Sequence, residues 1–373
     1  MPSFHPPRRL LLGPGPSDVP QRILDALARP TIGHLDPAFV GMMDELKELL
    51  RYAFQTANTL TIPVSAPGSA GMEACFVNLI EPGDTVIVCR NGVFGGRMRE
   101  NVLRVGATPV MVEDDFGQPV DPDKVEAALR ANPGAKAVAF VHAETSTGAA
   151  SDAATLCRLA REHGALSIVD AVTSLGGTEL DVDGWGIDAI YSGSQKCLSA
   201  PPGLSPLSFS ARATDTLKAR KSPVQSWFLD LSLVMGYWDG SGGRSYHHTA
   251  PVNMAYALHE SLTMLKEEGL TAAWARHRAN HERLRDGLQA LGLELLVDER
   301  HRLPQLNAVV VPEGVDEAGV RRTLLDTHSI EIGAGLGPLA GKIWRIGLMG
   351  ASSRPEAVAR VLEALAQALG RRA

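Results

Sequence analysis

The 373-residue sequence has few cysteines, few aromatic residues, no long hydrophobic run and no excess of positive charge. Its four cysteines show no paired metal-ligand spacing, and a chain of this length does not need disulfides to fold. We therefore expect no metal site, and a reducing cytoplasm as the compartment. A net charge of −6 gives no basic field that would hold a phosphate backbone. Nucleic acid is not an expected partner.

Hydrophobic residues are plentiful but dispersed. No segment reaches the length needed to span a bilayer, and the three leucines after Arg8 and Arg9 are too few for a signal peptide. We expect no membrane association. With 45% hydrophobic and 21% charged residues, the composition is that of an ordinary globular protein. The length fits about two domains.

Short apolar runs alternate with helical patterns over the first 210 residues. The runs are rich in Val and Ile and read as strands: LTIPVS, TVIVC, ATPVMV, KAVAFVH, ALSIVD and DAIYSG. This alternation predicts a mainly parallel sheet with helices on both faces. One helix is expected after Asp36 as N-cap, because apolar residues recur at helical spacing from Phe39 to Phe54.

The pattern changes beyond residue 250. Two long helical patterns, 252–269 and 271–292, precede the shorter strands NAVVVP and KIWRIG and a last amphipathic helix near 356–369. We predict an N-terminal arm over 1–16, a large domain over 17–268 and a smaller C-terminal α/β domain over 269–373.

Polar residues follow the predicted strands, at the sheet edge where ligands bind in open α/β folds. Gly68, Ser69 and Ala70 come after LTIPVS and open a predicted helix, whose N–H groups would favour a phosphate. Phe94 follows TVIVC, and Thr145 follows KAVAFVH. For residues 68–70 an ordinary helix cap is the plainer interpretation, and for Phe94 a position in the core.

Asp170 ends a buried strand, where a carboxylate needs a cationic partner. A structural salt bridge and a protonated pyridine nitrogen would both serve. Lys196 follows Gln195 at the end of DAIYSG and precedes the stiff turn SAPPG. A lysine amine in such a partly desolvated place forms Schiff bases with carbonyl cofactors, although an exposed loop lysine is the ordinary case. A lysine, an aspartate, a helix end and an aromatic ring are the protein parts that pyridoxal phosphate requires.

Five motifs resemble the class V aminotransferases of the alanine–glyoxylate and serine–glyoxylate (serine–pyruvate) group. They are SGSQKCLSAPPG, VDAVTSLGG, LGPGPSDVP, HAETSTG and SYHHTAP, and the resemblance runs from residue 10 to about 365. It implies an α/β fold of type I, with a mainly parallel seven-stranded sheet in the large domain. The implied activity is pyridoxal 5′-phosphate-dependent transfer of an amino group from alanine or serine to glyoxylate or pyruvate by a ping-pong mechanism.

The resemblance also implies roles for particular residues. Lys196 would bind the cofactor aldehyde and move the substrate proton, and Asp170 would hold the pyridine nitrogen protonated. Phe94 would stack on the ring and Thr145 would bond its 3-hydroxyl side. The phosphate would contact the 68–70 turn and Gln195.

The remaining implied contacts involve the substrate and a second subunit. Arg345 would bind the substrate carboxylate in a bidentate fork, with Gly15 beside the substrate. Tyr246 and Thr249 would reach the phosphate of the neighbouring subunit, which makes a homodimer with shared active sites part of the expectation. The adjacent His247 and His248 are expected to be structural, because neighbours in a strand point to opposite faces.

The phosphate loop departs from the family pattern. Ala66 and Pro67 stand where relatives usually have glycine and serine or threonine, and Pro67 offers no N–H group. His34 is assigned either to the substrate pocket or to a helix-entry loop.

Other reactions use the same frame. A cysteine desulfurase is disfavoured because no cysteine follows Cys197. Pyridoxamine–pyruvate and ureidoglycine–glyoxylate transamination remain alternatives, as does a non-catalytic scaffold of the same fold.

Overall fold

The computed structural model describes residues 1–239 and 244–371. Its helices are α1 (Gln21–Leu27), α2 (Pro37–Phe54), α3 (Gly68–Leu79), α4 (Val93–Arg104), α5 (Pro122–Ala131), α6 (Ala153–Glu162), α7 (Ala211–Lys218), α8 (Leu231–Trp238), α9 (Val252–Glu268), α10 (Leu270–Ala290), α11 (Glu317–His328) and α12 (Pro355–Ala368). Its strands are β1 (Leu10–Leu11), β2 (Leu60–Val64), β3 (Thr85–Arg90), β4 (Thr108–Glu113), β5 (Ala137–Val141), β6 (Ala143–Glu144), β7 (Ala149–Ala150), β8 (Leu166–Asp170), β9 (Ala189–Tyr191), β10 (Ser205–Phe209), β11 (Leu306–Val310), β12 (Ile330–Glu331), β13 (Gly333–Ala334) and β14 (Ile343–Gly347).

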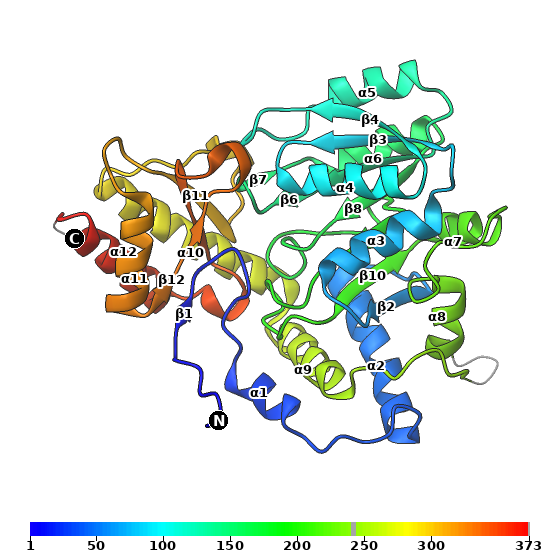
Figure 1. The fold of residues 1–373 in the computed structure, drawn as a ribbon, viewed down its shortest axis with the longest axis horizontal. Coiled ribbons are helices and arrows are strands. Elements are labelled where there is room, and N and C mark those ends of the chain that lie inside the picture. The colour runs from blue at the N-terminus through cyan, green and yellow to red at the C-terminus, as the bar shows by residue number, and fades with distance from the viewer. Residues whose placement is uncertain (240–243, 372–373) are drawn as a thin grey trace.

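A seven-stranded sheet forms the large part of the molecule, which lies at the right of Figure 1. Its strand order is β2-β10-β9-β8-β5-β3-β4, and β10 alone runs antiparallel to both of its neighbours. The six predicted apolar runs are β2, β3, β4, β5, β8 and β9, so the mainly parallel seven-stranded sheet is confirmed. β10 was not predicted, because its sequence SPLSF has only two large apolar residues.

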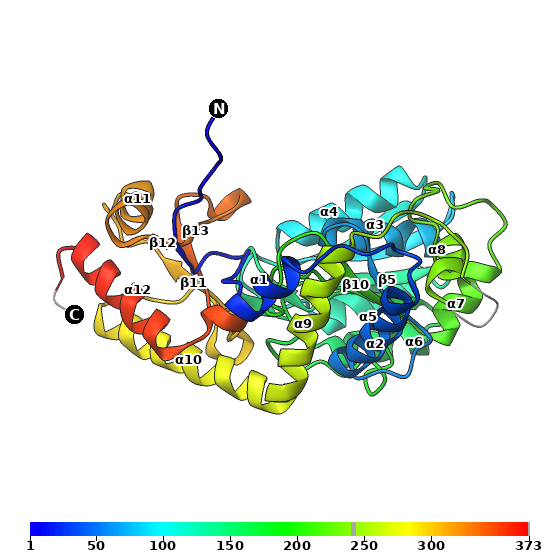
Figure 2. The same cartoon turned by 90° about the horizontal axis from the view of Figure 1, so that it is seen from below.

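Helices cover both faces of this sheet (Figure 2). α3 and α4 pack on one face, and α5 and α6 pack on the other beside α2 and α9. α2 begins as expected, because the Asp36 carboxylate accepts the Ala38 N–H at 2.8 Å and Pro37 occupies the first turn. Its predicted apolar stripe from Phe39 to Phe54 is buried.

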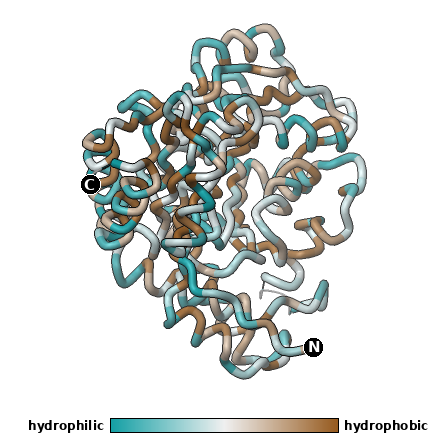
Figure 3. Tube along the Cα trace, turned by 60° about the vertical axis from the view of Figure 1, so that its left-hand side comes forward, coloured by the Kyte–Doolittle hydropathy of each residue, from teal (hydrophilic) through white to brown (hydrophobic). Residues whose placement is uncertain are grey.

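The C-terminal part has its own small sheet, in the order β11-β14-β13, with α10, α11 and α12 around it. Most buried apolar residues form one cluster around the large sheet and a second that includes Leu284, Trp344 and Val361, and a small third cluster includes Cys197 and Met349. Hydrophobic stretches of the chain are correspondingly found in both parts (Figure 3). α10 contributes to both clusters, through Ala273 to the first and Leu284 to the second. The boundary at residue 269 stays a prediction.

The N-terminal arm is anchored on the C-terminal part of its own chain. β1 pairs in parallel with β12, and Leu12 donates its N–H to Glu331 O at 2.9 Å. Leu10 and Leu12 are buried in the second apolar cluster. From Leu10 to Leu12 the arm is therefore held by contacts within its own chain. Among the described residues no helix combines the length and apolar character needed to cross a membrane.

Candidate active site

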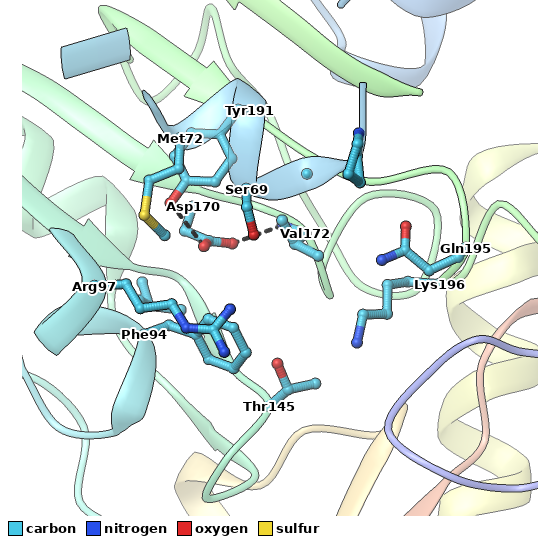
Figure 4. Close-up of a pocket in the computed structure, with 13 residues that line it drawn as sticks. Ser69, Met72, Phe94, Arg97, Thr145, Asp170, Val172, Tyr191, Gln195 and Lys196 are labelled. Carbon is cyan, nitrogen blue, oxygen red and sulfur yellow. Dashed lines mark hydrogen bonds between the residues drawn. The ribbon is translucent and has the colours of Figure 1, made fainter. Parts of the chain in front are cut away.

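A pocket of about 630 Å³, measured to its open mouth, lies at the carboxyl ends of the central strands (Figure 4). Side chains from β8, β9, α3, α4 and the loops after β5 and β9 converge there. Seven predicted residues line it: Gly68, Ser69, Phe94, Thr145, Asp170, Gln195 and Lys196. Pro67, Met72, Arg97, Val141, Val172 and Tyr191 complete the lining.

The carboxylate of Asp170 is buried and has no ion-pair partner among the described residues. It accepts hydrogen bonds from the Val172 N–H at 2.8 Å and the Tyr191 hydroxyl at 2.7 Å. Burial raises the pKa of Asp170 to about 6, although these hydrogen bonds and the charge of Lys196 act in the opposite direction. The structural salt bridge considered for Asp170 is therefore not formed, and a cationic group entering the pocket would meet an uncompensated acid.

The Lys196 side chain is 8% exposed and lies in the turn after β9. Its Nζ donates to Pro14 O, and its backbone carbonyl accepts the Ser17 hydroxyl at 2.7 Å. Burial, and then the charge of Arg345, lower the pKa of Lys196 to about 8. A larger neutral fraction of the amine is consequently present near neutral pH than for an exposed lysine.

Gly15 lies directly against this lysine. A Cβ atom at residue 15 would stand 2.6 Å from Lys196 Cδ, and the backbone there has a φ of +104° that favours glycine. Gly15, which the resemblance places beside the substrate, therefore also makes room for the Lys196 side chain.

Arg345 lies on β14 and is buried beside the loop that carries Thr145. Its Nε donates to Ala334 O at 2.7 Å, and its Nη1 donates to Thr145 O at 3.1 Å. Burial lowers the pKa of Arg345 to about 10. Arg345 is not among the pocket-lining residues, but its charge acts on Lys196 and its guanidinium is held in a fixed orientation by two carbonyls.

The start of α3 faces the pocket with Pro67 as its N-cap residue and no side-chain cap. Gly68 and Ser69 line the pocket, but Ala70 does not, and the Ala70 N–H already donates to Pro67 O at 2.7 Å. The Gln195 amide oxygen is buried without a hydrogen-bond partner among the described residues. Phe94 presents its ring to the pocket, and the Arg97 guanidinium carbon lies 4.7 Å from the ring centroid.

Two lining residues that the sequence analysis missed are Arg97 and Tyr191. Arg97 comes one helical turn after Phe94 on α4, so that spacing alone was a usable sequence pattern. Tyr191 pairs with Asp170 in the register of β8 and β9. That relation depends on the strand order, which the sequence does not state.

Tyr246 and Thr249 lie outside the pocket of their own chain. Both are exposed, and their hydroxyls are 3.4 Å apart. The 244–250 segment is not a strand, so the argument that placed His247 and His248 on opposite faces was wrong: their Nδ1 atoms are 2.8 Å apart. Both rings have further polar partners, as expected for structural histidines.

His34 belongs to this same region rather than to the pocket lining. Its ring lies 5.3 Å from that of Tyr246 and 6.1 Å from that of Tyr237. Large apolar side chains are exposed nearby, with Tyr246 and Trp227 both 63% exposed and Phe228 and Leu233 each about 40% exposed. Such a patch is typical of a surface that another molecule covers.

Comparisons with known proteins agree on one family. Residues 10–346 match the family model described as aminotransferase class-V. The (S)-ureidoglycine–glyoxylate transaminase of Bacillus subtilis is 40% identical, over 96% of this chain and 90% of that protein. The alanine–glyoxylate aminotransferase of Drosophila melanogaster is 40% identical, over 97% and 93%. The crystal structure of an alanine–glyoxylate aminotransferase from Nostoc sp. superimposes with a TM-score of 0.97 at 46% identity, covering 99% of this chain and 97% of that one.

The Asp170→Asn variant tests the buried acid in the cofactor-free protein. Because the pKa of Asp170 is raised from 3.8 to about 6, the folded state binds a proton at the Asp170 carboxylate more tightly than the unfolded state does. The contribution of Asp170 to stability is therefore largest below pH 4 and is lost as the pH rises through 6. The free energy of unfolding of wild type, relative to Asp170→Asn, should fall by about 1 kcal/mol between pH 5 and 7.5.

Urea denaturation of both cofactor-free proteins at the two pH values measures this difference. A relative stability that stays constant, or rises with pH, would show that Asp170 is ionised without cost in the folded protein.

Proposed function

We propose that this chain, which belongs to the class V aminotransferases, transfers the amino group of a small L-amino acid to glyoxylate or pyruvate with pyridoxal 5′-phosphate as cofactor. The observation that carries the proposal is a buried amine and a buried, cation-free carboxylate that line one pocket, Lys196 and Asp170. Alanine and serine are the proposed donors. The names of all three relatives described above include glyoxylate, which favours glyoxylate as the acceptor.

The pocket fits the cofactor by the chemistry of its donors. When bound, pyridoxal phosphate supplies an aldehyde for the amino group and a ring that accepts electrons from the substrate α-carbon. Asp170 is proposed to hold a proton at the ring nitrogen, and the lack of an ion pair on this carboxylate supports that role. Phe94 would cover one face of the ring and Thr145 would bond its 3-hydroxyl side.

Lys196 is the proposed base as well as the residue that binds the aldehyde. Its lowered pKa leaves Nζ partly neutral near pH 7.5, so that Nζ can take a proton from the substrate α-carbon and return it at the next step. The Pro14 carbonyl, which accepts from Nζ, orients the amine. Gly15, with no side chain, leaves the space that this motion needs.

The phosphate is assigned to Gly68, Ser69 and Gln195 at the start of α3 and after β9. A helix N-terminus suits an anion, and no side chain in the described part of the molecule caps the start of α3. Ala70 is the least supported of the predicted phosphate contacts, because its N–H is already bonded within the turn. Pro67 lines the pocket but contributes no donor.

Tyr246 and Thr249 are proposed to complete the phosphate site of a second copy of this chain. Their exposure, within an apolar patch that includes Trp227 and Phe228, supports a homodimer in which this surface is covered. The alternative is a contact within one chain, since His248 bonds to Ser65 just before the phosphate turn. Four buried free thiols support the proposed reducing cytoplasm.

The half-reactions give the direct test. The purified protein with pyridoxal phosphate should show a visible absorption band that disappears with L-alanine or L-serine and returns with glyoxylate or pyruvate. Lys196→Ala should lose both this band and steady turnover. Absorption spectra recorded after each addition make the measurement.

Other outcomes of the same titration separate the alternatives. A response to (S)-ureidoglycine or to pyridoxamine with pyruvate, but to neither amino acid, would reassign the donor. A protein that binds no pyridoxal phosphate would overturn the cofactor assignment and favour a non-catalytic scaffold.

Arg345→Lys tests the substrate carboxylate site. Nε and Nη1 of Arg345 are held by carbonyls, and Nη2 has no hydrogen-bond partner among the described residues, so the guanidinium is preoriented for a bidentate contact. A lysine cannot reproduce that fork, and KM for the amino donor should rise about tenfold or more, with cofactor affinity nearly unchanged. The exposed Arg360→Lys on α12 is the control, and steady-state kinetics with a cofactor titration measure both values. Equal losses of donor and cofactor binding would indicate a folding role.

Mixed dimers test the shared site. Tyr246→Phe combined with Thr249→Val removes both hydroxyls while keeping their shapes, and should weaken cofactor binding about tenfold. Co-expression with Lys196→Ala should restore one intact site in each mixed dimer, with wild-type cofactor affinity. Turnover of the purified mixed dimer as a function of cofactor concentration measures this.

A mixed dimer of Lys196→Ala with Asp170→Asn is the control, because both changes affect the site of their own chain and neither complements the other. Unrestored affinity in the first mixed dimer would place the hydroxyls in their own subunit.

A further inference from the structure

Glu144 is a completely buried acid next to the pocket, and it has no role in the function proposed above. It lies on β6, and no ion pair of its carboxylate is found in the described part of the chain. Burial raises its pKa to about 7. Burying an acid without an ion pair costs folding free energy, which hydrogen bonds partly offset. The groups that Glu144 binds therefore show which parts of the structure it holds in place.

One carboxylate oxygen of Glu144 reaches the start of α4. Oε2 accepts the Phe94 N–H at 3.3 Å, and Ser146 Oγ accepts the Val93 N–H at 2.9 Å. The N-cap residue of α4, Gly92, has no side chain to cap the helix. The first turn of α4 is thus capped by residues about 50 positions away in the sequence, because free N–H groups at a helix start need acceptors.

Gly92 is the residue that allows this approach. A Cβ atom at residue 92 would lie 2.3 Å from Cγ and Cδ of Glu144, so only glycine leaves room for the carboxylate beside the helix start. Gly92 has an extended backbone, and its requirement comes from this close contact rather than from its φ angle.

The second oxygen of Glu144 fixes the loop that carries Thr145. Oε1 accepts the Ser146 N–H at 2.9 Å and the Ser146 hydroxyl at 2.6 Å. Thr145 lies between these two residues, and its carbonyl accepts from Arg345 Nη1. One carboxylate therefore links Phe94, the Thr145 loop and, through that loop, Arg345.

We infer that Glu144 is a positioning residue that holds Phe94 against the cofactor ring and the Thr145 carbonyl against Arg345. This inference rests on the proposed function, since it assigns the ring and the substrate carboxylate to this pocket. Glu144 itself is not among the residues that line the pocket.

Glu144→Gln tests the inference with a side chain of the same shape. The amide replaces one of the two acceptor oxygens by an NH₂ group, which cannot accept a hydrogen bond. Either the Phe94 N–H or the Ser146 N–H and hydroxyl then lose their acceptor. Pyridoxal phosphate should bind about fivefold more weakly or worse, and KM for the amino donor should rise. The exposed Glu73→Gln on α3 is the matched control and should leave both values unchanged.

A double-mutant cycle shows whether the effect passes through Phe94. In a Phe94→Ala background, Glu144→Gln should weaken cofactor binding by a clearly smaller factor, because only its effect through the Thr145 loop is left, while its effect on donor KM through Arg345 should remain. If Glu144→Gln weakens cofactor binding by the same factor with and without Phe94, the inference is wrong.

Hydrogen exchange of the cofactor-free protein gives a readout that does not depend on the proposed function. Amides of residues 93–96 should exchange at least several-fold faster in Glu144→Gln, with those of β5 unchanged. Ser146→Ala should do the same if Glu144→Gln does not fold. If exchange at residues 93–96 is the same in Glu144→Gln and in wild type, the inference is wrong. If the variant exchanges faster there but the wild-type protein binds no pyridoxal phosphate, only the proposed function is wrong.

Discussion

The burial of Asp170 without a cation is the constraint on which the rest of the pocket depends. A carboxylate at the end of a buried strand is tolerated because the Val172 N–H and the Tyr191 hydroxyl bind it, yet its pKa stays raised. Those two hydrogen bonds offset only part of the desolvation cost. The folded protein therefore carries a site that gains free energy when a cationic group enters, as expected where stability is traded for binding.

The same desolvation acts on the basic residues in the opposite sense. Lys196 and Arg345 are both buried, and each has a lowered pKa, in the case of Lys196 partly because Arg345 is near. Arg345 remains charged because its pKa of about 10 is still well above neutrality, whereas Lys196 titrates close to it. A fixed cation, Arg345, thus lies buried close to a titratable amine, Lys196, in the pocket lining. These are the two separate properties that the proposed roles of holding a carboxylate and moving a proton require.

The sequence predicted the residues whose positions depend on local order. Asp170 and Lys196 each follow an apolar run, and the carboxyl ends of parallel strands meet at one edge, so their convergence required no knowledge of strand order. Tyr191, β10 and the Glu144 cap were not predicted, because they depend on which strands are neighbours and in what register. Glu144 caps the start of α4 from a position 50 residues later in the chain, so the sequence of α4 itself contains no pattern that would reveal this contact. Roles assigned by resemblance, such as those of Tyr246 and Thr249, depend on a second subunit.

Both ends of the chain are needed to close the pocket around Lys196. Pro14 O from the arm accepts a hydrogen bond from its amine, Gly15 leaves room for its side chain, and β14 brings Arg345 from the C-terminal sheet. The arm reaches this place because β1 pairs with β12 and because Gly347 N donates to Leu12 O at 2.8 Å. The large domain alone supplies Asp170, Phe94 and the start of α3, which line the proposed cofactor side of the pocket. The proposed substrate side is instead built from the two ends of the chain, at a distance in sequence from the buried acid on β8.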